Sequence, residues 1–285
     1  MIMTSRIIIL GSNGQLGTEL SSLMPNASAF GHSGPGKKIN IENTDELNMI
    51  FKSIHPDVVI NSAAFTDVDA CETDRSRAYT INAESVRNIV SICRKYKSKL
   101  YQISTDYVFD GKSGDYKESA TLNPINYYGF SKSIGDAFAL SYENSLIIRT
   151  SGIYGHSRNF PMFTYESLRA NKQVNVIRGF YSPVHARSLA SAIVELIKQY
   201  EDLTGIINIA GEKISRLQFA RKIAEKFNLS TDLIREVESL SGFKAARPYD
   251  SSLDISYAKS ILKTDFYSME HNLEFLEETL IEEKK

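Results

Sequence analysis

The sequence contains no tryptophan and only two cysteines, Cys71 and Cys93. The two cysteines lie far apart, and neither has a second thiol or a histidine at the spacing of a metal site. This pattern argues against a disulfide framework and against a zinc site. We therefore expect reduced thiols, as in a cytoplasmic protein, and no bound metal.

Long hydrophobic runs and an excess of one charge are also missing. No apolar run approaches the roughly 20 residues of a membrane span, and the chain passes from Met1 into an apolar strand that contains Arg6, without a small-residue cleavage site. The 33 lysines and arginines nearly balance the 34 aspartates and glutamates, for a net charge of −1. Such a balance gives no general attraction for nucleic acid. We expect a cytoplasmic protein that binds neither nucleic acid nor a membrane.

What the sequence does contain is an alternation of short apolar runs with longer amphipathic ones. Its 285 residues are 42% hydrophobic, which is ordinary for a globular protein with a substantial core. The hydrophobic pattern predicts strands at residues 7–10, 58–60, 100–103 and 146–148, and helices at 16–23, at 76–96 and between the last two strands. Strands that alternate with helices indicate the α/β class, with a Rossmann-type, doubly wound parallel sheet.

The alternation loosens after about residue 150, where aromatic and polar loops separate helices near 186–199, 217–227 and 272–283. We therefore predict an NAD(P)-binding Rossmann domain over residues 1–150 and a smaller, mainly substrate-binding lobe over residues 151–285. A strand at 206–209 predicts that residues of about 185–210 return to the first domain.

A glycine-rich turn follows the first predicted strand and opens the first predicted helix. Gly11 permits a tight turn, Gly14 permits close approach of a phosphate, and Gly17 lets helix and strand pack closely. A plain strand-to-helix turn is the alternative, but this position favours a dinucleotide pyrophosphate. The second strand ends near residues 30–33 without an acid to bind the adenine ribose, so NADPH fits at least as well as NADH.

Tyr128 and Lys132 stand four residues apart, hence on one face of the helix that is expected to begin near residue 127. A nearby ammonium lowers the pKa of a phenol, which makes the phenol a better proton carrier. This pair predicts proton transfer to or from a substrate oxygen. Chance on a surface helix is the alternative, although no other tyrosine in this chain is followed by lysine at that spacing.

Thr105 follows the predicted strand at 100–103, at the sheet edge where ligands of open α/β folds bind. Its hydroxyl suits a hydrogen bond to the reacting oxygen, and a simple end-of-strand cap is the alternative. Small residues at 61–64 end another strand, where they would admit a cofactor or merely pack. Asn82 is interpreted either as a group that orients a water or a main-chain group near Lys132, or as an ordinary polar helix residue.

Together these segments resemble the extended short-chain dehydrogenase/reductase family, and within it the dTDP-4-dehydrorhamnose reductases. The resemblance runs through residues 11–17, 61–68, 104–111, 123–132, 149–151, 247–248 and 252–254, and the run Ser-Thr-Asp-Tyr-Val-Phe-Asp-Gly is its most specific part. It implies three sets of site residues. The catalytic set is Thr105, Tyr128 and Lys132; the cofactor set is Gly11, Asn13, Gly14, Gln15, Leu16, Asn40, Ile41, Ala63, Ala64, Phe65 and Thr66, with Tyr128 and Lys132; the substrate set is Thr105, Asp106, Val68 and Arg247.

Arg247 is expected near the diphosphate of a nucleotide sugar, because a guanidinium binds phosphate through paired hydrogen bonds; a surface arginine is the alternative. Two positions depart from the family. Asn40 stands where relatives usually have an acid, and Gly152 stands where they commonly have an aromatic residue. Tyr154 or Phe180 is a candidate to supply that aromatic surface.

The resemblance implies a cytoplasmic enzyme that uses NADPH or NADH to reduce the C4 ketone of a dTDP-4-keto-6-deoxysugar. The most direct reaction is dTDP-4-dehydro-L-rhamnose to dTDP-L-rhamnose. Two alternatives stay open: a non-catalytic regulatory subunit of the methionine adenosyltransferase type, and another nucleotide-sugar epimerase or dehydratase. By family analogy, a homodimer formed through helices is compatible with the chain.

Overall fold

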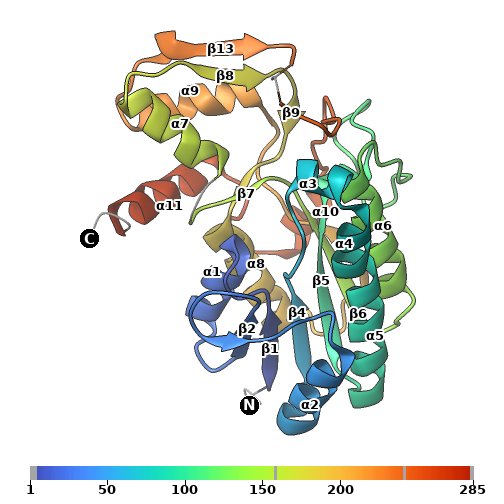
Figure 1. Cartoon of the computed structure of the whole chain (residues 1–285). Coiled ribbons are helices and arrows are strands. Elements are labelled where there is room, and N and C mark those ends of the chain that lie inside the picture. Colours follow the sequence, from blue (N-terminus) through green and yellow to red (C-terminus); the bar gives the residue numbers. More distant parts are fainter. Residues whose placement is uncertain (1–4, 157–158, 240–241, 283–285) are drawn as a thin grey trace.

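A seven-stranded sheet forms the centre of the computed structural model, which describes residues 5–156, 159–239 and 242–282 (Figure 1). The strand order is β11-β6-β5-β4-β1-β2-β3, and all neighbouring strands run parallel. The strands are β1 (Ile7–Leu10), β2 (Ser28–Gly31), β3 (Lys37–Lys38), β4 (Val58–Asn61), β5 (Lys99–Thr105), β6 (Ser145–Thr150) and β11 (Gly205–Asn208). The predicted Rossmann-type parallel sheet is confirmed.

Helices cover both faces of this sheet (Figure 1). One face packs on α1 (Gln15–Leu23) and α8 (Ala186–Gln199), and the other packs on α2 (Thr44–Ile54), α5 (Ser85–Tyr96) and α6 (Tyr127–Leu140). The side chains of alternate strand residues pack in the two hydrophobic cores. Ile9 and Ile60 face α1 and α8, whereas Ile8 and Val59 face α2 and α5. Burial on both faces explains why these strands are apolar throughout.

The helix expected at 76–96 is interrupted by a π-helical turn. It consists of α4 (Arg75–Tyr79), the turn η1 (Thr80–Glu84) and α5. Helix α6 packs closely across this turn, since a Cβ atom at Gly135 would lie only 2.2 Å from the carbonyl oxygen of Asn82. Isolated π-helical turns often occur at functional sites. This one brings Asn82 between α6 and the loop after β4.

The chain after residue 150 contributes a second group of elements, with β8, β13, α7 and α9 above the carboxyl edge of the sheet in Figure 1. Its strands pair in three small sheets: β7 (Ile153–Tyr154) with β10 (Val184–His185), β9 (Phe180–Tyr181) with β12 (Ile214–Ser215), and β8 (Val174–Ile177) with β13 (Ile234–Val237). The helices are α7 (Phe160–Arg169), α9 (Arg216–Lys226), α10 (Ser256–Ile261) and α11 (Met269–Glu282), with the 3-10 turn η3 (Thr231–Leu233). Because β11 pairs with β6 in the large sheet, the chain returns to the first group of elements; a domain boundary at residue 150 stays a prediction.

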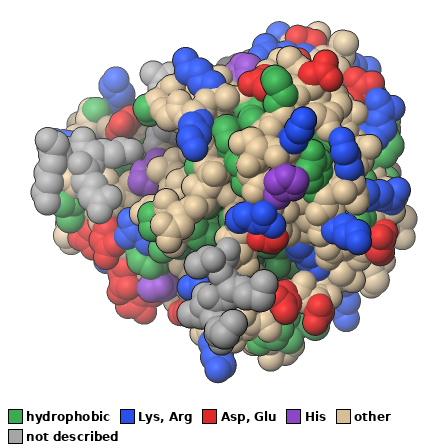
Figure 2. Space-filling model, turned by 90° about the horizontal axis from the view of Figure 1, so that it is seen from below, with side chains coloured by type: hydrophobic (Ala, Val, Ile, Leu, Met, Phe, Trp, Pro, Cys, Tyr) green, Lys and Arg blue, Asp and Glu red, His purple; other side chains and the backbone are tan. Residues whose placement is uncertain are grey.

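Both signs of charge are interspersed on the molecular face that Figure 2 shows. Cys71 and Cys93 are buried and free. Among the residues that the structure describes, no helix combines the length and the apolar composition that crossing a membrane requires.

Candidate active site

The glycine-rich turn joins β1 to α1 with very little space around it. Gly11 has φ of +87°, and a Cβ atom there would lie 2.6 Å from the backbone nitrogen of Ala63. A Cβ atom at Gly17 would lie 2.1 Å from the carbonyl oxygen of Gly11. Glycine at these two positions therefore lets β1, α1 and the loop after β4 meet closely.

The first turn of α1 has the properties of an anion site. Gly14 is the N-cap residue, and no side chain caps the helix there. Free backbone N–H groups and the positive end of the helix dipole favour a phosphate at this position. The Oε1 atom of Gln15 is buried without a hydrogen-bond partner; as an acceptor it suits a hydroxyl or amide donor, and the phosphate is left to the backbone N–H groups. The residues present thus fit the pyrophosphate of a dinucleotide.

Other residues predicted to line the cofactor have structural partners. The side-chain amide of Asn13 donates to the carbonyl of Pro35 at 3.0 Å, which ties the turn to the loop after β2. Leu16 and Ile41 are buried in the two cores, so only their backbones suit cofactor contact. Asn40 is exposed, and its Oδ1 atom accepts from the backbone N–H of residue 42 at 3.1 Å.

The loop after β4 is fixed to α6 through Asn82. The Oδ1 atom of Asn82 accepts from the N–H of Phe65 at 2.8 Å, and its Nδ2 atom donates to the Phe65 carbonyl and to Ser131 Oγ, both at 3.0 Å. Ala63, which touches Gly11, and Ala64 are half-buried, whereas Thr66 at the end of this run is exposed. Asn82 therefore orients main-chain groups, as one of its two interpretations predicts.

Tyr128 and Lys132 lie one turn apart on α6. Lys132 is 3% exposed, and its ammonium donates to the carbonyl of Ile103 on β5 at 2.7 Å. The Tyr128 ring is half-buried and packs edge-on against Tyr107, with ring centroids 5.9 Å apart. The structure thus brings phenol and ammonium to the carboxyl end of β5, where ligands of open α/β sheets bind.

Burial has the largest effect on the pKa values of Tyr128 and Lys132 in the protein without ligands. It raises the pKa of Tyr128, while hydrogen bonding with Thr105 acts in the opposite direction. The pKa of Tyr128 is therefore raised overall, whereas the spacing to Lys132 predicts a lowered pKa. The loss of hydration, which disfavours the phenolate, is the largest of the effects on this group. Burial lowers the pKa of Lys132, and the charge of Asp136 opposes that change.

Thr105 ends β5 and caps the 3-10 turn η2 (Asp106–Val108). Its hydroxyl donates to Asp106 Oδ1 at 3.1 Å and accepts from the N–H of Tyr107 at 3.2 Å. The buried carboxylate of Asp106 also accepts from Ser151 Oγ at 2.8 Å and from Ser251 Oγ at 2.6 Å. Thr105 is therefore both a cap and a neighbour of Tyr128, whereas contact between Asp106 and a sugar stays a prediction.

Val68 begins the short helix α3 (Val68–Thr73). The next residue of this helix, Asp69, binds Arg247, the side chain that is predicted to contact a diphosphate. Arg247 forms two contacts with the Asp69 carboxylate, at 2.8 and 3.3 Å. Its guanidinium also lies over the ring of Phe243, 4.5 Å from the centroid. Because a carboxylate already balances this cation, binding of a diphosphate by Arg247 stays a prediction.

Tyr181 lies against Gly152, and the sequence analysis did not single it out. A Cβ atom at Gly152 would lie 3.0 Å from its Cε2 atom, so the Tyr181 ring covers the glycine. Of the two candidates for an aromatic surface there, Tyr154 is 1% exposed and belongs to the core around Phe219. Phe180 packs instead against Tyr249. Because β9 is only two residues long, no hydrophobic periodicity distinguished Tyr181 from its neighbours.

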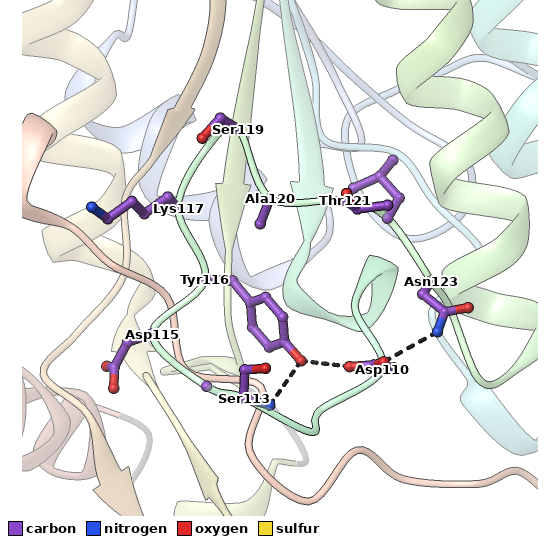
Figure 3. A pocket seen from close by; sticks show the side chains of 11 residues that line it. Asp110, Ser113, Asp115, Tyr116, Lys117, Ser119, Ala120, Thr121 and Asn123 are labelled. Atoms are coloured by element: carbon purple, nitrogen blue, oxygen red, sulfur yellow. Dashed lines mark hydrogen bonds between the residues drawn. The ribbon is translucent and has the colours of Figure 1, made fainter.

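A separate open cavity of about 720 Å³ lies within the loop of residues 110–123 (Figure 3). The Tyr116 hydroxyl points at Asp110 and donates to it at 2.6 Å, and Asn123 donates to the same carboxylate at 3.1 Å. No residue of the predicted site lines this cavity. In the part of the chain that the structure describes, no cluster of histidine, cysteine and acidic side chains is placed to hold a metal ion.

Comparison with known proteins gives consistent results over nearly the whole chain. It is 31% identical over 268 residues to a dTDP-4-dehydrorhamnose reductase of Aggregatibacter actinomycetemcomitans, which covers 88% of this chain and 91% of that protein. A crystal structure of a hypothetical dTDP-4-dehydrorhamnose reductase from Sulfolobus tokodaii is 48% identical, with a TM-score of 0.89 and coverage of 93% and 97%. The dTDP-4-dehydrorhamnose reductase of Bacillus anthracis in complex with NADP is 31% identical, with a TM-score of 0.88 and coverage of 98% and 100%. Residues 5–280 match the model of the RmlD substrate binding domain family, and the chain belongs to that family.

Proposed function

We propose that this protein is an NAD(P)H-dependent reductase that acts on the C4 ketone of a dTDP-4-keto-6-deoxysugar. The most direct substrate is dTDP-4-dehydro-L-rhamnose, which would be reduced to dTDP-L-rhamnose. The observation that carries this proposal is the meeting of Tyr128, Lys132 and Thr105 at the carboxyl end of β5. The family membership and the names of the relatives support the substrate class.

The chain's own residues have distinct roles in this proposal. The nicotinamide cofactor, when bound at the turn of residues 11–16, supplies the hydride. Tyr128 then gives its hydroxyl proton to the substrate oxygen as negative charge develops there. Thr105 hydrogen-bonds the same region, and the Lys132 ammonium binds ribose hydroxyls and stabilises the phenolate that Tyr128 becomes.

The raised pKa of Tyr128 suits this direction of reaction. A phenol whose pKa is raised stays protonated at neutral pH, so the proton donor is present before the substrate is reduced. The positive charge of Lys132 matters only as the proton leaves, when it meets the negative charge on the phenol oxygen. This separation of roles is how an enzyme stabilises a transition state more than a ground state.

The cofactor is NADPH or NADH, and NADPH fits this site at least as well as NADH. No acid follows β2 at the place that usually binds the adenine ribose, and the loop there is Gly31-His32-Ser33-Gly34. The similar protein from Bacillus anthracis was solved with NADP. The lobe of residues 151–285 would hold the nucleotide sugar, with Val68, Asp106 and Arg247 at its border.

The direct test is to mix the purified protein with NADPH or NADH and the ketosugar generated in situ. We expect loss of the reduced-nicotinamide absorbance and formation of dTDP-L-rhamnose. No turnover, together with a stable complex with a methionine adenosyltransferase, would favour the regulatory subunit. NAD that stays bound through purification, with no net consumption of cofactor, would favour an epimerase or dehydratase.

A further inference from the structure

A buried cluster of three charged residues lies behind the candidate active site. Lys132 and Asp136 are one turn apart on α6, and Arg149 lies on β6. Their exposed fractions are 3%, 1% and 2%. Arg149 is the strand partner of Ser104, the residue that precedes Thr105, so the cluster borders the site from behind β5.

Asp136 is held by few direct contacts. Ser104 Oγ donates to its Oδ2 atom at 2.6 Å, and Arg149 Nε lies 3.8 Å from the same oxygen. Its Oδ1 atom and Arg149 Nε are buried without a hydrogen-bond partner. Arg149 is otherwise held by the carbonyl of Glu118 at 3.0 Å and by the ring of Phe109, 5.3 Å away.

These groups are costly to bury, and their charges depend on one another. Burial raises the pKa of Asp136, while the charges of Lys132 and Arg149 lower it. Burial lowers the pKa of Lys132, and the negative charge of Asp136 raises it. Among the described residues, the Lys132 ammonium donates its hydrogen bond to the Ile103 carbonyl, so Asp136 acts on it from the next helical turn through its charge and not through a direct contact.

We propose that Asp136 is a positioning residue that keeps the Lys132 ammonium charged beside Tyr128, and that Arg149 limits its effect by sharing the carboxylate. The cluster of two cations and one carboxylate then has a single net positive charge. When the Tyr128 hydroxyl gives its proton to the substrate oxygen, the new phenolate balances that charge. The inference rests on the proposed function and adds to it the source of the charge on Lys132.

Other titratable groups near Tyr128 and Lys132 belong to different elements, and the variants described below do not change them. Tyr107 and Asp106 lie in η2, and Cys71 lies in α3; all three act electrostatically on Tyr128. Tyr128 itself is on α6, one turn before Lys132. Because these groups are common to every variant below, differences between variants report on the cluster.

The test compares Asp136→Asn, Arg149→Met and Ser104→Ala with the unmodified protein. Asparagine keeps the shape of Asp136 and still accepts from Ser104, but it has no charge. The pKa of Lys132 is measured without cofactor, by NMR of protein with labelled lysine side chains, and its signal is identified by its loss in Lys132→Met. Asp136→Asn should lower that pKa by about one unit or more, because an opposite charge is lost.

The sign of the change separates electrostatics from general damage. Arg149→Met should raise the Lys132 pKa, since a neighbouring cation is lost while Asp136 keeps its charge, and Ser104→Ala, which removes a hydrogen bond but no charge, should change the Lys132 pKa less than either of the other substitutions. In ketosugar reduction, the alkaline limb of kcat should shift in the same directions. At a pH between the two Lys132 pKa values, Asp136→Asn should reduce kcat about tenfold while the Kd of NADPH, measured at lower pH where both ammonium groups are charged, changes little.

Equal Lys132 pKa values in the unmodified protein and in Asp136→Asn would overturn the inference. If Asp136→Asn does not fold, an unchanged Lys132 pKa in Arg149→Met overturns the inference in the same way. A shifted pKa with no shift in the alkaline limb of kcat would also contradict it. Failure of the unmodified protein to reduce any ketosugar would instead refute the proposed function, whatever the NMR titration shows.

Discussion

Thr105 connects the candidate proton donor to the buried carboxylate of Asp106. We predict that Thr105→Val lowers kcat for ketosugar reduction about tenfold, because it removes a hydroxyl beside Tyr128 without removing bulk. Thr105→Ser keeps the hydroxyl and should stay near the unmodified rate. Steady-state kinetics with both variants checks this, and equal rates for the valine and serine variants would contradict it.

Gly11 and Gly36 offer a matched pair for the phosphate-binding turn. Both have a positive φ, but a Cβ atom at Gly11 meets the backbone of Ala63, whereas one at Gly36 meets nothing within 4 Å. Gly36→Ala should cost about 1–2 kcal/mol of unfolding free energy from backbone strain alone. Gly11→Ala adds overpacking and should cost about 2–5 kcal/mol.

Urea unfolding of the two variants measures this difference. Gly11→Ala should also weaken NADPH binding, because the loop after β4 and the start of α1 can no longer approach each other. Equal stabilities for Gly11→Ala and Gly36→Ala would mean that the contact between Gly11 and Ala63 is unimportant.

Spacing in the sequence was sufficient to predict the Tyr128 and Lys132 pair, but not the cluster behind it. Tyr128, Lys132 and Asp136 recur at every fourth residue on α6, so a third member of the pattern was visible. A charged residue in a helix or strand usually faces solvent, however, and Asp136 and Arg149 are buried only because α6 crosses β5 and β6. Their positions required the tertiary structure.

At the scale of elements, α6 acts as the support that fixes the phenol and the ammonium against β5. It crosses η1 closely at Gly135, which lies over the carbonyl of Asn82. Alanine normally stabilises a helix relative to glycine, but here we predict that Gly135→Ala destabilises the protein by about 1–3 kcal/mol through overpacking. Ser133→Ala on the same helix, which removes only a local bond to the Phe130 carbonyl, should change stability by less than about 0.5 kcal/mol.

Thermal or urea unfolding of Gly135→Ala and Ser133→Ala compares the two changes directly. A more stable Gly135→Ala variant would show that α6 does not depend on this close approach. A structural change at η1 should also alter the loop after β4, because Asn82 joins that loop to α6.

The elements that could be predicted from the sequence are those with a strong hydrophobic period. The strands β1, β4, β5 and β6 read as apolar runs because both faces of the sheet are covered. The π-helical turn η1 was missed because its residues continue the helical pattern on both sides. Strands such as β7, β9 and β12 are too short to show a period, and backbone pairing with distant residues defines them.

At the scale of the whole molecule, the two groups of elements meet at the carboxyl edge of the sheet. Asp69 of α3 accepts from the N–H groups of Lys244 and Ala245 and pairs with Arg247, so it ties a distant loop to the border of the site. The proposed cofactor would contact β1, the loop after β4, and α6 at once. Its binding should therefore stabilise the complete fold.

We predict that NADPH at about 100 times its Kd raises the free energy of unfolding by about 2.7 kcal/mol. For a chain of this size the change corresponds to a rise in Tm of about 5 °C. Differential scanning fluorimetry with NADPH and NADH measures the shift and the preference together. No rise at saturating concentrations of either nucleotide would contradict a dinucleotide site at the glycine turn.

We expect Tyr128 to give the proton in a reduction that Lys132 supports. The most direct test is the kcat of Tyr128→Phe in ketosugar reduction, with the Kd of NADPH measured on the same preparation. We predict a kcat lower by roughly 100-fold or more and an NADPH Kd close to that of the unmodified protein, since only the proton donor is lost. An unchanged kcat would contradict it.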